Sequence, residues 1–373
     1  MMAGARDTTD GEGGSRGLPR QRPLNVGVIG AGYISAATHV PFLKKIPSAS
    51  LTAIADVDLE RARHLSKVHG IPRATDDYRD LLADDAIDVI DICTPPFTHQ
   101  QIIVDAAAAG KRIIVEKPLA VGLPDALAIR QAIQETGGTL GIVLNLRYMP
   151  LVQSIPRILW SSQFGPVGAI TATAHSFPPA TGWIGHPPYD EFGVLYDFFP
   201  HVVDLVMWSL QATPTEVLCV RKESGPHHAY CVIVKLRLPS DRTCVMLSDL
   251  KWTSATSLRL LRFDAEKHTL FVDLQDQFCQ VTSGHITPKK RVEEFIRRMG
   301  GLGKRVAKGR MAIRYGGMIY HHALLSDFLN DFSMRRAPRI SIVDGILHMA
   351  VIDAAIRSCR ENRPVEIDRG LLL

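Results

Sequence analysis

Residues 24–35 constrain the fold more than any other stretch of the chain. An apolar, β-branched run ends at Gly30 and a helical pattern resumes after Gly32, so both glycines lie on a strand-to-helix turn. Gly30 permits a tight turn, and Gly32 leaves room for backbone N–H groups to approach phosphate oxygens beside the positive end of the helix. The third small position is Ser35 in place of glycine. By itself this turn fits either a dinucleotide pyrophosphate or an ordinary tight turn.

A second predicted strand favours the dinucleotide. Residues 51–56 form an apolar run that ends in Asp56, at the distance downstream where a ribose-binding carboxylate is expected. Such a carboxylate would repel a 2′-phosphate by about 4 kcal/mol, for unit charges roughly 4 Å apart at an effective dielectric near 20. We therefore expect NAD in preference to NADP, with Arg61 as the one nearby residue that argues for NADP.

Strands and helices alternate up to residue 145, which requires a parallel sheet with right-handed crossovers. We predict a doubly wound Rossmann domain over residues 23–145, in which the strand ends at Gly30, Asp56, Cys93 and Glu116 line one crevice. The first helix, over residues 32–46, should bend or break at Pro41.

The pattern changes after residue 145. Six strands follow one another without helices between residues 215 and 282, which implies an antiparallel sheet. Residues 177–194 read as a loop rich in proline and glycine, and helices over 317–332 and 342–359 should pack back on the interdomain seam. The expected fold is α/β: a tail over residues 1–22, the Rossmann domain, and an α+β domain over 146–373 that has a large, mostly antiparallel open sheet and serves substrate binding and oligomerisation.

The bulk properties exclude several classes of protein. No apolar run approaches 18 residues, so no membrane span is expected, and residues 1–22 lack the apolar core of a signal peptide, which favours the cytoplasm. The six cysteines have no metal-like spacing, so we expect reduced thiols and no metal. An open sheet face invites a homodimer or homotetramer.

Residues 289–314 hold most of the positive charge. This segment has ten Lys or Arg residues against Glu293 and Glu294, a local excess of eight that exceeds the whole chain's net charge of +5. It is either a solvated helix and loop or a rim that attracts an anionic substrate. Because no aromatic residues interleave with the basic ones, nucleic acid is not an expected partner.

Lys117 follows a predicted strand within Glu116-Lys117-Pro118, where it would point into the crevice. It is either exposed to substrate or a surface lysine before a turn. Pro118 fixes the direction of the chain, and the bond before it is either cis or trans.

A second group of polar residues lies at the start of a predicted helix. Proline is tolerated at the first helical position, so the helix should begin at Pro200 and place His201 in its first turn. There the helix dipole disfavours imidazolium and keeps the ring neutral, a form that can accept a proton. Asp197 can hydrogen-bond the imidazole or the substrate, whereas Asp204 reads as structural.

Together these motifs resemble the Gfo/Idh/MocA family (glucose-fructose oxidoreductase, inositol dehydrogenase and relatives) over residues 23–367. The matching motifs are Val-Ile-Gly-Ala-Gly at 28–32, Ala55-Asp56, Thr-Pro-Pro-Phe-Thr-His at 94–99, Glu116-Lys117-Pro118, Asn-Leu-Arg-Tyr-Met-Pro at 145–150, Asp197 with His201 and Asp204, and Val-Ile-Asp-Ala-Ala-Ile-Arg-Ser at 351–358. The chain departs from the family in the bulky Phe198, Phe199 and Pro200 between the aspartate and the histidine.

The resemblance implies a nicotinamide-dependent sugar or polyol oxidoreductase whose active-site trio is Lys117, Asp197 and His201. His201 would take the hydroxyl proton while hydride leaves the same carbon, and Lys117 would bind the developing oxyanion. The residues assigned to the cofactor are Gly30, Gly32, Tyr33, Ile34, Asp56, Thr94, Pro95, His99, Glu116 and Lys117. Those assigned to a sugar, inositol-like polyol or nucleotide-linked sugar are Asn145, Arg147, Tyr148, His175 and Trp183.

Two alternatives stay open. One alternative to the oxidoreductase is a non-catalytic dinucleotide-sensing regulator. The other is an NAD-assisted lyase or glycosidase that oxidises its sugar only transiently. A sensor has no need of Lys117, Asp197 and His201 together, which favours the oxidoreductase. The sugar, the hydroxyl and the physiological direction are not determined by the sequence.

Overall fold

The computed structural model describes residues 22–177, 187–222, 229–252, 257–283 and 319–372. The basic segment 289–314, Trp183 and the predicted tail, apart from Arg22, lie outside the described residues.

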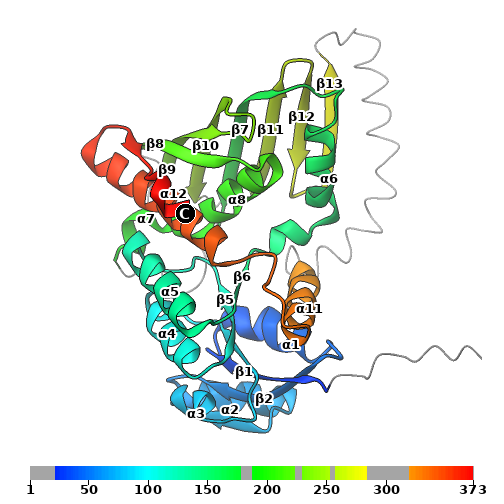
Figure 1. Ribbon diagram of the computed structural model, residues 1–373, viewed down its shortest axis with the longest axis vertical. Coiled ribbons are helices and arrows are strands. Elements are labelled where there is room, and N and C mark those ends of the chain that lie inside the picture. Colours follow the sequence, from blue (N-terminus) through cyan, green and yellow to red (C-terminus); the bar gives the residue numbers. More distant parts are fainter. Residues whose placement is uncertain (1–21, 178–186, 223–228, 253–256, 284–318, 373) are drawn as a thin grey trace, which may run out of the picture.

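The first half of the chain forms a six-stranded sheet in the order β3-β2-β1-β4-β5-β6, and every neighbouring pair is parallel (Figure 1). The strands are β1 (Leu24–Ile29), β2 (Ala49–Ala55), β3 (Arg73–Thr75), β4 (Val89–Ile92), β5 (Arg112–Glu116) and β6 (Leu140–Val143). The strand order reverses between β1 and β4, and a dinucleotide binds at such a switch point. The predicted Rossmann sheet is confirmed, although the short β3 was not predicted.

Helices pack on this sheet with ends that match their sequence signals. They are α2 (Leu59–His69), α3 (Arg79–Leu82), α4 (His99–Ala108) and α5 (Leu123–Thr136). The carboxylate of Asp58 caps α2 by accepting the N–H of Arg61, and α2 ends at Gly70, whose φ of 62° is left-handed.

The first helix does not break at Pro41, and a bend there stays a prediction. A π-helical turn (Ser35–His39) leads directly into α1 (Val40–Leu43), so helical backbone continues through Pro41. The π-helical turn buries His39 completely inside the domain.

The second half of the chain forms an eight-stranded sheet in the order β13-β12-β11-β7-β10-β9-β8-β14. Its pairs are antiparallel except for β7 with β10, which confirms the mostly antiparallel sheet. The strands are β7 (Val167–Ser176), β8 (Thr213–Lys222), β9 (Ala229–Arg237), β10 (Thr243–Trp252), β11 (Leu258–Ala265), β12 (His268–Asp273), β13 (Phe278–Ser283) and β14 (Val365–Glu366).

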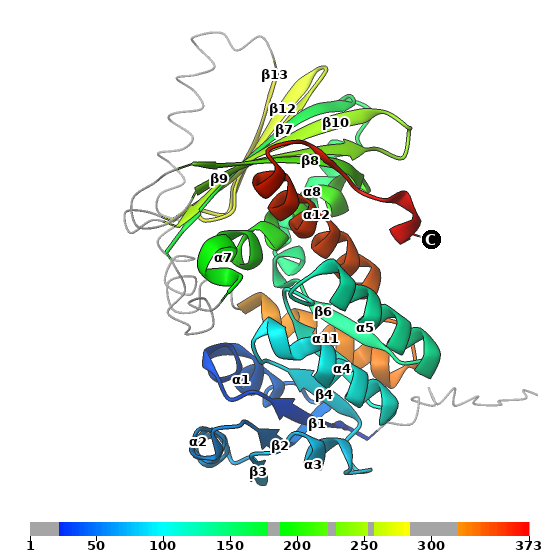
Figure 2. The same ribbon diagram turned by 90° about the vertical axis from the view of Figure 1, so that its left-hand side faces the viewer.

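Helices lie between this sheet and the Rossmann sheet (Figure 2). They are α7 (Tyr189–Asp197), α8 (Phe199–Leu210) and α12 (Ile342–Glu361), and α6 (Pro150–Leu159) packs against α8. The start of α7 falls in the predicted loop 177–194, so the loop is shorter than predicted. Gly193, which favoured a loop, lies within α7, and glycine is needed there because a Cβ would lie 2.0 Å from the Trp252 ring.

The helix α11 (Tyr320–Ser333) lies beside α1 in the Rossmann part of the molecule, far from it in sequence (Figure 1). The predicted division at residue 145 remains a prediction. Among the described residues, none of the helices combines the length and apolar character needed to cross a bilayer. All six cysteines are free thiols, as expected.

Candidate active site

The glycine turn after β1 has the conformation that a phosphate-binding turn needs. Gly30 has a φ of 98°, and a Cβ there would lie 2.9 Å from the carbonyl carbon and oxygen of Cys93. A side chain at Gly30 would therefore be strained and would clash. A Cβ at Gly32 would meet no heavy atom within 4 Å, so the space above the turn is open.

The Asp56 carboxylate reaches this turn from the end of β2. Its Oδ2 accepts the N–H of Ala31 at 2.7 Å, and its Oδ1 accepts the N–H of Asp58 at 2.9 Å. Arg61 lies beside it, with 3.7 Å between Nη1 and Asp56 Oδ2. The turn and the acid thus meet at one point, as a ribose and pyrophosphate site requires.

The other residues predicted to bind the cofactor surround the crevice in different ways. Tyr33 is 63% exposed, and Ile34, Thr94 and Pro95 are half-buried. His99 is fully buried, with Nδ1 3.0 Å from the Pro118 carbonyl and Nε2 2.9 Å from the Thr94 carbonyl. His99 therefore connects the segment after β4, at Thr94, to the segment after β5, at Pro118.

Lys117 follows β5 and meets Asp197 from the second half of the chain. Its ammonium donates to the Asp197 main-chain carbonyl at 2.7 Å and to Asp197 Oδ1 at 3.0 Å. Asp197 is the last residue of α7, so its carbonyl belongs to the negative end of that helix. The bond between Lys117 and Pro118 is cis. The structure brings these two predicted residues together.

His201 lies in the first turn of α8, which begins at Phe199 with Pro200 second, one residue earlier than predicted. Burial and the positive charges of Lys117 and Arg259 hold the pKa of His201 well below its usual value of 6.5. Its Nδ1 is buried without a hydrogen-bond partner in the described part of the chain. The ring is therefore neutral, as the helix position predicts.

Arg259 on β11 is a site residue that sequence reasoning missed. Its guanidinium carbon lies 4.5 Å from the centre of the Phe198 ring, and that ring lies 5.7 Å from the His201 ring. The sequence did carry a signal. Arg259 shares one strand face with the buried Leu261 and Phe263, and a charged residue on such a face is unusual.

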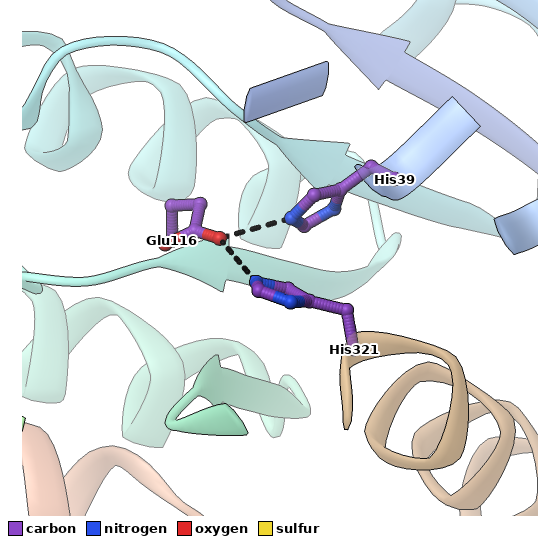
Figure 3. A group of neighbouring side chains, drawn as sticks. All are labelled: His39, Glu116 and His321. Atoms are coloured by element: carbon purple, nitrogen blue, oxygen red, sulfur yellow. Dashed lines mark hydrogen bonds and ion pairs between the residues drawn. The ribbon is translucent and has the colours of Figure 1, made fainter. Parts of the chain in front are cut away.

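His39, Glu116 and His321 form a buried group of side chains, and Glu116 directly precedes Lys117 in the chain (Figure 3). Glu116 Oε2 accepts the backbone N–H of Lys117 at 3.0 Å, while Oε1 lies 3.0 Å from His39 Nε2 and 3.6 Å from His321 Nε2. The other nitrogen of His39 lies 2.8 Å from Asp91 Oδ2. Burial opposes ionisation, yet the hydrogen bonds from His321 and His39 lower the pKa of Glu116. Glu116 thus positions the lysine.

The same side chains have the types and spacing of metal ligands. His39 with Glu116 and His321, and His39 with Asp91 and Cys93, each offer three ligand atoms within 4.8 Å of one another. His39 already bonds to both Asp91 and Glu116 without a metal. The absence of a metal from the protein remains a prediction.

Arg147, predicted to bind substrate, lies in a buried ion network. It forms a bidentate pair with Asp204, with 2.9 Å between Nε and Oδ2, and its Nη2 lies 2.7 Å from Asp344 Oδ1. His348 Nε2 lies 3.0 Å from Asp204 Oδ1. Burial favours the neutral acid, but Arg147 and His348 hold the pKa of Asp204 at about 2. Asp204 is structural, as predicted.

The remaining residues predicted to bind substrate are dispersed. Asn145 Nδ2 lies 3.4 Å from His321 Nδ1, next to the group below Lys117. The hydroxyl of Tyr148 donates to Asp327 at 2.6 Å, and His175 Nε2 lies 2.9 Å from Asp249 Oδ2 on the neighbouring strand. Of these three residues, only Asn145 contacts the buried group of His39, Glu116 and His321 next to Lys117.

Comparison with known proteins agrees with this geometry. Residues 24–143 match the model of an oxidoreductase family with an NAD-binding Rossmann fold. The chain is 32% identical to the uncharacterized oxidoreductase YrbE of Bacillus subtilis over 197 residues, which are 52% of this chain and 56% of that protein. It is 24% identical to inositol 2-dehydrogenase of Rhizobium meliloti over 92% of this chain and 99% of that one.

Among solved structures, levoglucosan dehydrogenase in complex with NADH and levoglucosan shares the fold. Its TM-score is 0.76 at 18% sequence identity, over 93% of this chain and 100% of that one. The chain spans about half the length of the first curated relatives that it matches. Residues 24–143 are thus similar to the NAD-binding Rossmann part of the Gfo/Idh/MocA oxidoreductases.

Proposed function

We propose that this protein is an NAD-dependent oxidoreductase that transfers a hydride between the nicotinamide and a secondary alcohol or ketone of a sugar or polyol. One observation carries the proposal: the Lys117 ammonium meets Asp197 across the two halves of the chain, beside the neutral imidazole of His201. Curated relatives named as dehydrogenases of inositol, D-apiose and levoglucosan support the substrate class.

The residues around the first turn fit the cofactor. The open space above Gly32 would admit a pyrophosphate, and the Asp56 carboxylate would accept ribose hydroxyls. Bound NAD supplies the hydride acceptor. Asp56 favours NAD over NADP, because a 2′-phosphate would approach a carboxylate of the same charge. Arg61 offsets this only in part, since its half-exposed guanidinium is already shared between Asp56 and Asp58.

Lys117, Asp197 and His201 have separate roles in the proposed proton transfer. His201 Nδ1 is enclosed, so Nε2 is the atom that takes the proton of the substrate hydroxyl. Positioned base catalysis of this type contributes about 10²- to 10⁴-fold. The Lys117 ammonium stabilises negative charge on the reacting oxygen, and Asp197 holds the ammonium in place. In the reverse direction His201 returns the proton.

A homo-oligomer is part of the proposal. Apolar side chains are exposed on the strands β8 and β10, namely Val220, Val245 and Leu247. Within the described residues, the helices packed on the second sheet all lie on its other side (Figure 2). A second copy of the chain that covered this open face would bury these side chains.

The test is a panel of neutral inositols, aldoses and alditols, with NADH formation followed by absorbance. We expect turnover of at least one cyclic polyol or sugar, faster with NAD than with NADP. Binding of NADH without turnover of any panel member would contradict the proposal and favour the sensing regulator. Consumption of a sugar without net NADH would instead favour the lyase or glycosidase.

A further inference from the structure

Arg259 is a cation without a hydrogen-bond or ion-pair partner among the described residues. Its side chain is half-buried and its Nε is fully buried, yet within the described residues it has no hydrogen bond or ion pair. A guanidinium has five N–H donors, and burying them without acceptors costs free energy. Such a group needs an acceptor beyond the described residues, and a bound ligand is one that would supply it.

The position of Arg259 points to the candidate active site. One face of its guanidinium lies over the Phe198 ring, which in turn packs against His201. A cation–π contact with this ring uses none of the N–H donors, so they stay available to another partner. Both His201 and Asp197 lie close enough to interact electrostatically with Arg259.

The charges of the site do not cancel. Asp197 is the one carboxylate that acts on Arg259 electrostatically, and its Oδ1 is already paired with the Lys117 ammonium at 3.0 Å, so among the described residues Arg259 forms no ion pair of its own. A substrate with a single negative charge would balance the site. A carboxylate matches one guanidinium edge through two parallel hydrogen bonds, whereas a phosphate dianion would need a second unpaired cation.

We propose that Arg259 binds a carboxylate of the substrate, so that the enzyme acts on a sugar acid or polyol acid. This inference rests on the proposed function and narrows its substrate class. The hydroxyl that reacts lies toward Lys117 and His201, and the carboxylate lies toward β11. Arg259 is then a specificity residue that takes no part in the proton transfer.

The experiment compares acids with their neutral parents. The acids are D-glucuronate, D-galacturonate, D-gluconate and D-galactonate, the neutral partners are D-glucose and D-galactose, and glucose 6-phosphate represents the phosphate class. Binding to the full-length enzyme with NADH is measured by calorimetry, and turnover with NAD by absorbance. The variants are Arg259→Met, Arg259→Lys and a control, Arg262→Met.

Arg262 is a matched control because it lies three residues along the same strand, half-exposed and 2.9 Å from Asp264. We expect at least one acid to bind the wild type more tightly than its neutral parent. Arg259→Met should weaken the binding of that acid by about 10- to 100-fold, the usual effect of losing a hydrogen bond to a charged group. The same variant should weaken the binding of the neutral sugars far less than the binding of that acid, Arg259→Lys should give an intermediate loss of acid binding, and Arg262→Met none.

The melting temperature separates this role from a structural one. Because Arg259 has no partner to lose, Arg259→Met should keep or raise the melting temperature, whereas a structural arginine would lower it. Failure of all four acids to bind, or equal binding by Arg259→Met, would overturn the inference. Tighter, Arg259-dependent binding of glucose 6-phosphate would overturn the carboxylate class. Arg259-dependent binding of an acid without NADH formation would support the inference while the proposed function failed.

Discussion

The helix α8 carries two groups of charged side chains that differ in how completely they are paired. Asp204 is 1% exposed and is met by Arg147 and His348, while Arg147 is met in turn by Asp344. One turn away, His201 has a buried nitrogen without a partner and faces Arg259, which also has none in the described chain. The first group is complete in the protein alone, and the second is incomplete without a ligand.

This difference separates stability from function on a single helix. Removing a partner from a complete buried ion network leaves a charge that cannot reach water, so stability falls. Removing a group whose partners are absent leaves nothing unpaired in the protein. Mutations in the first group should therefore change folding, whereas mutations in the second should change binding and turnover.

The largest effect is expected from Arg147→Met. Asp204 would keep only His348 as a close partner, and loss of one member of a buried pair costs about 3 to 5 kcal/mol. The free energy of unfolding from urea denaturation checks this. Arg259→Met should not lose stability in the same assay, and the exposed control Arg262→Met should change by less than about 0.5 kcal/mol. If Arg147→Met lowered the free energy of unfolding by less than about 1 kcal/mol, the distinction between the paired group at Asp204 and the unpaired group at His201 would fail.

A smaller effect is expected at the cofactor end of the site. Asp56→Ser removes the charge that would repel a 2′-phosphate, so the preference for NAD over NADP should fall by about tenfold or more. The ratio of kcat/KM for the two cofactors measures it. Glu60→Gln is the matched control, because Glu60 is exposed on α2 and pairs only with Arg63. Unchanged selectivity in Asp56→Ser would exclude the ribose role.

The sequence predicted local features better than contacts between residues far apart in the chain. The turn at Gly30 and the acid at Asp56 follow from neighbouring strand ends, so residue spacing was sufficient. His201 in a first turn followed from Pro200. The start of α7 was missed because Gly193 reads as a loop residue, and only the packed Trp252 ring explains a helical glycine there.

Contacts between distant segments could not be read from residue spacing. Arg259 gains its role from Phe198 and Asp197, which lie about 60 residues earlier in the chain. His39 and His321 meet at Glu116 only because α11 packs beside α1. The partners of Arg147 could not be predicted from residue spacing either. The sequence therefore assigned Arg147 to the substrate, whereas in the structure it pairs with the carboxylates of Asp204 and Asp344.

The most direct test of the account is the pH dependence of kcat/KM for the wild type and His201→Ala. In the proposed mechanism the neutral ring is the base, so activity should fall when the pH drops through the depressed pKa of His201. The acid limb of the wild type should therefore lie below pH 6.5. His201→Ala should lack this limb and turn over about 100-fold or more slowly, with NADH binding unchanged. A limb at or above 6.5, or the same profile in His201→Ala, would contradict the assignment of His201 as the base.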